Sequence, residues 1–182
     1  MSLASGERQG SIWEDTLRLG ELIAQADLAA AGSHQRAFEH ALTRDLRARA
    51  QEFHHPLVNP LQGDHQVPVP RVLGEDRRPT LSLDSDGTAI EVRFIDHNPE
   101  AVKTAVGQAM VYRLHYRFVI LVFVLSATQQ EAFEEASGSD SENGLSHLMG
   151  HLADQLGIFG IFRTGFAPTS GCPHTLSFLP EQ

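Results

Sequence analysis

Cysteine, long apolar runs and a leader sequence are what this chain has least of. Cys172 is the single cysteine of its 182 residues, so no disulfide can close within the chain, and without a cysteine framework the ten histidines do not predict a structural zinc module. The longest apolar run, residues 118–125, has the length of a strand and falls far short of the roughly 20 residues that span a bilayer. The opening residues show no basic region followed by an apolar one, as a secretory signal would. We therefore expect a cytoplasmic protein with no membrane segment.

Lysine is nearly absent as well. Lys103 stands alone beside thirteen arginines, and the net charge is −9 at pH 7. A net acidic chain repels a phosphate backbone and has little of the counterion-release affinity that drives nonspecific nucleic-acid binding. Any contact with nucleic acid is therefore expected to be weak.

The length and the 41% share of hydrophobic residues predict a single domain with one core. We divide it into an N-terminal helical extension over 1–32, a central region over 34–125, and a C-terminal loop, helix and strand over 126–182. No internal repeat is visible.

Two helices are predicted before the first strand. Apolar residues three and four apart predict a helix over 12–31, ended by Gly32. A second helix over 34–53, with Ser33 as its N-cap, carries one apolar stripe. The stripe consists of Phe38, Leu42, Leu46, Ala50 and Phe53.

Prolines dominate the stretch that follows. Five of them between residues 54 and 79 predict a loop, with an irregular edge strand over 65–73. A hairpin comes next, in which the turn sequence DSDG at 84–87 joins a strand at 81–83 to a longer strand at 88–95.

The second half of the chain alternates helices and strands. The predicted elements are a helix over 99–116 with Asn98 as its cap, a buried strand over 117–125, a helix over 146–157 with Ser146 as its cap, and a strand over 158–165. This alternation predicts an α/β fold whose mixed central sheet is covered by helices.

Two opposite charges share one face of the longer hairpin strand. Side chains alternate along a strand, so Glu91 and Arg93 point the same way while Val92 points the other way. Taken alone, this pattern is typical of a solvated strand face with a weak ion pair.

The surrounding residues give the pair a wider context. Pro79-Thr80 precedes the first hairpin strand, Glu91-Val92-Arg93 lies on the second, and the following helix contains Gln108 and Tyr112 four residues apart. In this order they resemble the motifs of the PD-(D/E)xK nuclease superfamily, RecB-like branch: Pro-Asp, then (Asp/Glu)-x-Lys, then Gln-x-x-x-Tyr. The resemblance covers residues 34–125 and implies a three-layer restriction endonuclease-like fold with an αβββαβ core.

The resemblance also implies a chemistry. Carboxylates in this family hold Mg²⁺ or Mn²⁺, which activates water and offsets charge on a phosphodiester. By this carry-over the catalytic set is Glu91, Arg93, Gln108 and Tyr112, and the metal ligands are Glu91 and Glu39, the latter from the first core helix.

Both departures from the family pattern affect catalysis. Thr80 stands where the metal-binding aspartate belongs, and Arg93 where the lysine belongs. A hydroxyl is a poor cation ligand, and arginine does not accept a proton. Lys103 cannot replace the missing lysine, because about 100° per residue turns it some 140° away from Gln108.

Two functions remain open on these residues. One is metal-dependent hydrolysis of nucleic acid, with Arg93 as a phosphate clamp. The other is a non-catalytic nuclease-fold scaffold or regulatory protein that works through a protein partner or a second copy of itself.

A separate cluster of polar residues lies near the C-terminus. His147, His151 and Asp154 fall at helical spacing and could present metal ligands on one face, although the glutamate of HExxH is missing. The sequence favours the other interpretation, a solvated or partly packed helix face. Cys172 and His174 are read as loop residues.

Overall fold

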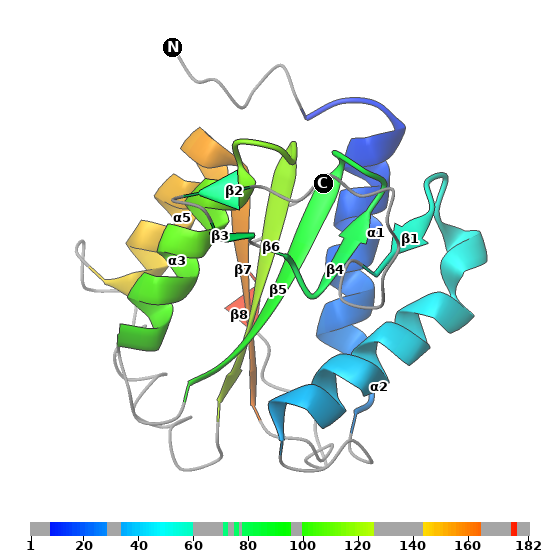
Figure 1. Cartoon of the computed structure of the whole chain (residues 1–182), viewed down its shortest axis with the longest axis horizontal. Helices are drawn as coiled ribbons and strands as arrows, with labels where there is room; N and C mark the ends of the chain where they lie inside the picture. Colours follow the sequence, from blue (N-terminus) through cyan, green and yellow to red (C-terminus); the bar gives the residue numbers. More distant parts are fainter. Residues whose placement is uncertain are drawn as a thin grey trace.

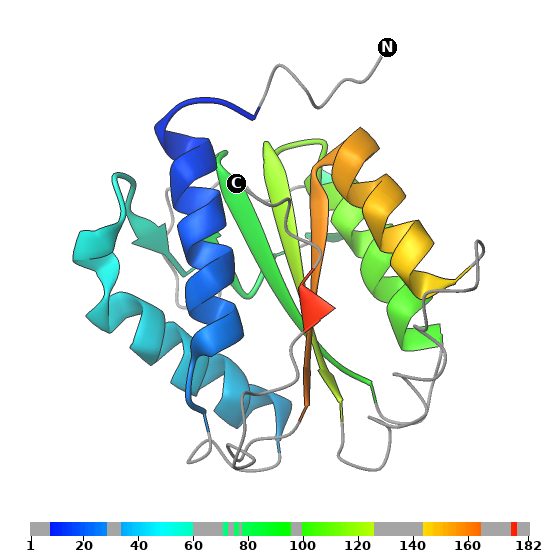
Figure 2. The ribbon, with the colours of Figure 1, turned by 180° about the vertical axis from the view of Figure 1, so that it is seen from behind.

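The protein is an α/β domain in which a mixed open sheet lies between two pairs of helices (Figures 1 and 2). The computed structural model describes residues 8–28, 34–59, 71–72, 75–76, 78–95, 100–125, 144–164 and 176–177. Among these the four α-helices are α1 (Ser11–Gln25), α2 (Gln35–Ala48), α3 (Glu100–Tyr112) and α5 (Leu145–Leu156), and a short 3₁₀ helix, η2 (Ala50–Glu52), follows α2.

The main sheet has six described strands in the order β1-β4-β5-β6-β7-β8. β5, β6 and β7 run parallel, while β1, β4 and β8 join antiparallel. The strands are β1 (Leu57–Val58), β4 (Leu81–Leu83), β5 (Thr88–Ile95), β6 (Phe118–Leu125), β7 (Ile158–Thr164) and β8 (Leu176–Ser177). A separate pair, β2 (Arg71–Val72) and β3 (Glu75–Asp76), stands outside this sheet.

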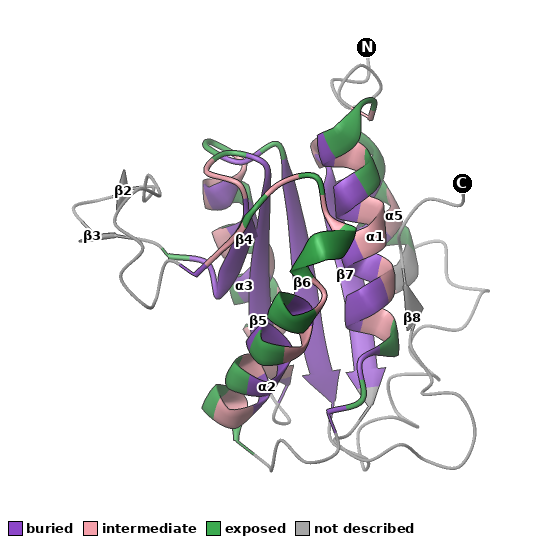
Figure 3. Cartoon of the chain, turned by 90° about the vertical axis from the view of Figure 1, so that its right-hand side faces the viewer, coloured by how far each residue is buried: buried purple, intermediate pink, exposed green. Residues whose placement is uncertain are grey.

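β6 lies at the centre and is buried along its whole length (Figure 3). Alternate side chains enter two cores, because successive residues of a strand point to opposite faces. Ile120 and Val122 pack toward α1 and α2, whereas Leu121 and Phe123 pack toward α3 and α5. The continuous apolar run predicted as a central strand is therefore confirmed.

The side chain of Arg163 on β7 sets the end of α1. Its guanidinium is buried and donates to the carbonyls of Ile23, at 3.0 Å, and of Ala26. These carbonyls belong to the last turn, where no intrahelical N–H is left to satisfy them. Ala26 turns to ψ 127°, so the helix stops there.

The predicted helix over 12–31 is thus too long at its C-terminal end, and Gly32 lies outside the described residues. The helix predicted over 34–53 is α2 followed by the 3₁₀ helix η2, and it begins after His34, which makes no side-chain cap bond. Ser33 lies outside the described part. Phe38, Leu42 and Leu46 are buried as expected, while Ala50 is exposed, because the helix has already changed pitch.

The later helices also differ at their ends. The third helix ends at Tyr112 and gives way to a turn, where the sequence predicted helix to residue 116. Its predicted cap, Asn98, lies outside the described part. α5 begins one residue before Ser146, after Gly144, so Ser146 is inside the helix and is not its cap.

Among the strands, the hairpin is confirmed and the first strand was misplaced. β4 and β5 pair from Leu81–Ile90 to Leu83–Thr88 around the DSDG turn, in which Asp84 adopts φ 59°, a conformation that aspartate tolerates better than most residues. The strand that precedes them in the sheet is β1. Of the predicted strand over 65–73, only Arg71 and Val72 are among the described residues, and they pair with β3.

Two more features complete the fold. The final strand predicted over 158–165 is confirmed as β7, and the edge strand β8 was not foreseen. In the part of the chain that the structure describes, every helix is too short or too polar to cross a bilayer.

Arg163→Ala tests the role of the buried guanidinium. The substitution leaves two buried carbonyls without a donor, so we expect a loss of about 2–4 kcal/mol in the free energy of unfolding, measured by urea denaturation. Arg18→Ala is the matched control: this arginine makes exposed ion pairs with Glu21 and Glu52, and its loss should cost less than about 1 kcal/mol. Equal losses in the two variants would contradict the assignment.

Candidate functional site

The candidate site lies beside the first residue of β4, where β5 continues beyond the hairpin. The pair farthest from the turn is Leu81–Ile90, so beyond Ile90 no strand among the described residues pairs with β5 on the side away from β6. Side chains take the place of the missing strand at Val92. Thr80 Oγ1 accepts from the Val92 N–H at 3.3 Å, and Gln35 Nε2 donates to the Val92 carbonyl at 3.2 Å.

This edge explains why the threonine matters. Thr80 is 5% exposed, and its hydroxyl is engaged by the backbone of β5. Pro79, just before it, is also buried. Thr80 therefore completes the sheet edge beside the strand that carries Glu91 and does not present a free ligand.

Glu91 is a nearly buried carboxylate between two donors. It is 5% exposed and faces α3, on the side of the sheet opposite Ile90 and Val92. Arg93 Nη2 lies 2.5 Å from Glu91 Oε1, and the Tyr112 hydroxyl donates to Glu91 Oε2 at 3.0 Å. Each carboxylate oxygen thus has its own partner.

The helix α3 supplies the second layer of this network. Gln108 and Tyr112 lie four residues apart and therefore on one face. Gln108 Nε2 donates a hydrogen bond to the Tyr112 hydroxyl at 2.9 Å, and that hydroxyl in turn donates one to Glu91. Burial, and next the nearby charge of Glu91, raise the pKa of Tyr112, so it acts here as a donor and not as a base.

Burial raises the pKa of Glu91 from 4.5 to about 7. The positive charge of Arg93 and the hydrogen bond from Tyr112 act in the opposite direction, as does a backbone hydrogen bond from Thr80. The negative charge of Glu39 adds to the increase. At neutral pH this carboxyl is therefore poised between its two protonation states.

Glu39 reaches the same region from α2. Its carboxylate accepts from Gln35 Nε2 at 2.7 Å, the same amide that binds the Val92 carbonyl, and its charge acts on Glu91. Lys103, by contrast, is exposed and pairs with Glu100, so it lies away from the network as its helical position predicted.

The predicted residues thus come together in one place. The buried carboxylate of Glu91 lies beside an arginine and a tyrosine, and a glutamine binds the tyrosine. The negative charge of a second carboxylate, that of Glu39, raises the pKa of Glu91. Among the described residues, no group of three or more histidine, cysteine, aspartate or glutamate side chains is arranged to hold a metal ion. The set can bind a proton at Glu91, and the half-buried guanidinium of Arg93 pairs with the same carboxyl group.

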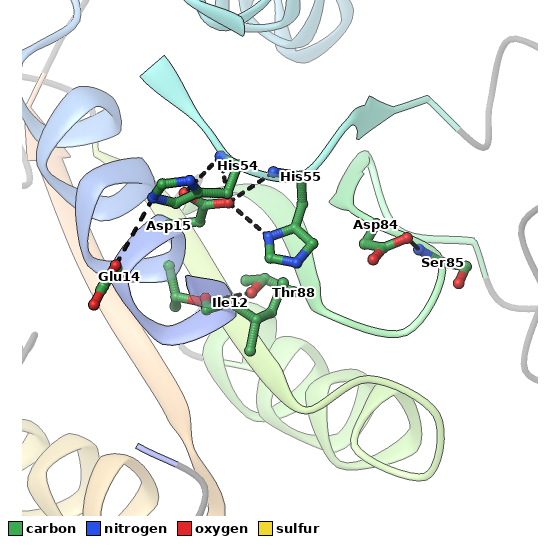
Figure 4. A network of polar contacts seen from close by, with 9 residues as sticks. Ile12, Glu14, Asp15, His54, His55, Asp84, Ser85 and Thr88 are labelled. Carbon is green, nitrogen blue, oxygen red and sulfur yellow. Dashed lines mark hydrogen bonds and ion pairs between the residues drawn. The ribbon is translucent and has the colours of Figure 1, made fainter. Parts of the chain in front are cut away.

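A second polar network was missed by the sequence analysis (Figure 4). The carboxylate of Asp15 on α1 is buried and accepts from the backbone N–H groups of His54 and His55 at 2.9–3.0 Å, and from His55 Nδ1 at 2.8 Å. These contacts fix the chain just before β1 against α1. Short-range patterns give no sign of this, because the partners are about 40 residues apart.

The polar residues of α5 lie partly as their spacing predicted. His147 Nε2 and His151 Nε2 are 2.9 Å apart on the exposed face of the helix. Asp154, the third residue of that stripe, instead lies 3.4 Å from Arg8. Cys172 and His174 lie outside the described residues.

Comparison of the whole chain with protein-family models, with curated proteins and with solved structures found no match.

Glu91→Gln tests the buried carboxyl through the pH dependence of stability. The folded pKa of about 7 lies above the unfolded value of 4.5, so the folded state holds the proton more tightly and wild-type stability falls as pH rises between these values. Glutamine carries no such penalty. The unfolding free energy of the variant relative to wild type should therefore rise by up to about 3 kcal/mol between pH 4.5 and pH 7.5.

Urea denaturation at a series of pH values measures this difference. Glu100→Gln, at an exposed position on α3, is the control and should leave the pH profile parallel to that of wild type. A difference between Glu91→Gln and wild type that stays constant with pH would contradict the buried, proton-binding carboxyl.

Proposed function

We propose that this chain is a non-catalytic relative of the restriction endonuclease-like nucleases, in which the guanidinium of Arg93 takes the place of the bound metal ion. It then acts as a scaffold or regulatory protein through contacts with a protein partner or a second copy of itself. The site and the charge of the chain both favour this over phosphodiester hydrolysis.

The order of elements supports the nuclease-like class. Leaving aside the separate β2–β3 pair, helix α2 is followed by the antiparallel strands β1, β4 and β5, then by α3 and by β6, which is parallel to β5. This is the αβββαβ order that the motif resemblance implies. The motif positions also fall at equivalent places: Thr80 before the second strand, Glu91 and Arg93 on the third, and Gln108 and Tyr112 on the helix that follows.

The observation that carries the proposal is the contact between Arg93 Nη2 and Glu91 Oε1 at 2.5 Å. A divalent ion bound by Glu91 would compete with Arg93 for Oε1 or with Tyr112 for Oε2, and two positive charges at one nearly buried carboxylate repel each other strongly. Magnesium also requires several oxygen ligands in near-octahedral geometry. The neighbouring Thr80 hydroxyl is used by the Val92 N–H, so it adds little to such a site.

The second function, metal-dependent hydrolysis, rests on Glu39. Its charge acts on Glu91, so two carboxylates approach the same region from α2 and β5. For an ion to bind between them, Arg93 must swing away from Glu91 and the carboxyl of Glu91 must lose its proton. The net charge of −9 also weakens attraction to a nucleic-acid backbone.

The proposal is tested by restoring the family residues with Thr80→Asp and Arg93→Lys together. The double variant has an added carboxylate and carries the point charge of lysine in place of the guanidinium, so it should bind Mn²⁺ where wild type does not. Isothermal titration measures binding. Cleavage of single- and double-stranded DNA and of RNA in Mn²⁺ should be absent in wild type and can appear only in the double variant.

Adding Glu91→Gln to the double variant is the matched control and should abolish the new Mn²⁺ binding. Two results would contradict the proposal. One is cleavage by wild type that disappears in the single variant Glu91→Gln, which favours the enzyme. The other is a folded double variant, by circular dichroism, that binds Mn²⁺ no better than wild type.

A further inference from the structure

We propose that His147 and His151 form a surface site for a divalent transition-metal ion of the kind that prefers nitrogen ligands, Cu²⁺ or Ni²⁺ before Zn²⁺. The site lies on the exposed face of α5 and does not depend on the function proposed for Glu91.

The two imidazoles already point at each other. His147 and His151 are one turn apart, their Nε2 atoms are 2.9 Å apart, and their rings meet at 83° with centroids 4.4 Å apart. Both side chains are exposed. A Cβ added at Gly150, between them in sequence, would meet nothing within 4 Å, so the space at that position of the helix is open.

The separation of the two nitrogens matches a shared ion. Histidine nitrogens bind such metals at about 2.0–2.1 Å, which places two ligands at a right angle about 2.9 Å apart and two tetrahedral ligands about 3.3 Å apart. The observed 2.9 Å therefore fits the square or octahedral arrangement that Cu²⁺ and Ni²⁺ adopt. Tetrahedral Zn²⁺ requires the rings to separate by a few tenths of an ångström.

A hydrogen bond between the rings is a weak alternative. On an exposed helix face it competes with water, so its net contribution is about 0.5–1.5 kcal/mol, and fixing two side chains in one geometry costs a similar amount of conformational entropy. Two metal–nitrogen bonds would hold the two rings in this arrangement more strongly than one exposed hydrogen bond does.

The remaining coordination positions of the ion are filled by water or by a ligand atom from another molecule. Asp154 is one turn beyond His151, but its carboxylate lies 3.4 Å from Arg8. The site therefore has two nitrogen ligands, and hard ions such as Mg²⁺, which prefer oxygen, should not bind there.

The test uses the full chain, purified without a histidine tag, and chloride salts of Cu²⁺ and Ni²⁺ as probes. Isothermal titration should find one site that is tighter than the others, and the electron paramagnetic resonance of one equivalent of Cu²⁺ should show nitrogen ligands. Excess EDTA should remove the ion. Because two ligands on one helix bind cooperatively, losing either one should weaken the tightest site roughly tenfold or more.

His147→Ala and His151→Ala are the test variants, and His115→Ala, which removes an exposed histidine beyond the end of α3, is the control. The first two should lose the tight site and its nitrogen signal, while the control should keep both. Alanine favours helix, so both test variants should fold, which circular dichroism checks.

Cu²⁺ and Ni²⁺ affinities within twofold of wild type in both test variants would overturn the proposal, because the tight site would then lie on other histidines. Mg²⁺ that displaces Ni²⁺ at similar concentration would overturn it too. Glu91→Gln should leave Ni²⁺ binding unchanged, so failure here and failure of the proposed function are distinguished.

Discussion

The contact between Glu91 and Arg93 is the interaction on which the character of the site depends. A carboxylate on a strand with almost no access to water is costly unless donors hold it, and Arg93 supplies one from two residues along the same face. Tyr112, held by Gln108, supplies the other from α3. The balance of burial against these donors leaves the pKa of Glu91 at about 7.

On the function proposed above, the same contact distinguishes a scaffold from an enzyme. A lysine at position 93 is a flexible point charge and leaves room for an ion, whereas a guanidinium binds a carboxylate in a fixed geometry and remains protonated. With Arg93 on Glu91 and Thr80 on the edge of β5, the residues that distinguish this chain from the nuclease pattern both act as structural partners.

Much of the fold follows from local pattern. The apolar run of β6 and the DSDG turn of the hairpin are strong signals, because a strand buried on both faces admits almost only apolar residues and a tight turn favours particular ones. The ends of elements do not follow in this way. α1 stops where Arg163, about 140 residues away, takes its last carbonyls, and β1 is only two residues long in a stretch rich in proline.

The sequence predicted which residues lie near Glu91 and did not predict how they interact. Spacing placed Gln108 and Tyr112 on one helical face, and strand alternation placed Glu91 beside Arg93. Whether that ion pair is solvated or buried depends on how far β4 extends and on what α3 packs against. Neither can be predicted from the local sequence. The Asp15 network shows the same limit, since its partners meet only after the helices have packed.

The central claim is that the guanidinium, and not a metal ion, occupies the place beside the Glu91 carboxylate. Carboxyl carbon signals of a protein labelled with ¹³C-glutamate, recorded while Mn²⁺ is added, test this most directly, because the paramagnetic ion broadens the signal of any carboxylate that binds it. Glu91→Gln identifies the Glu91 signal. The account predicts that this signal stays as sharp as those of buried carboxyls elsewhere. Selective broadening of the Glu91 signal at low Mn²⁺ concentration would contradict it.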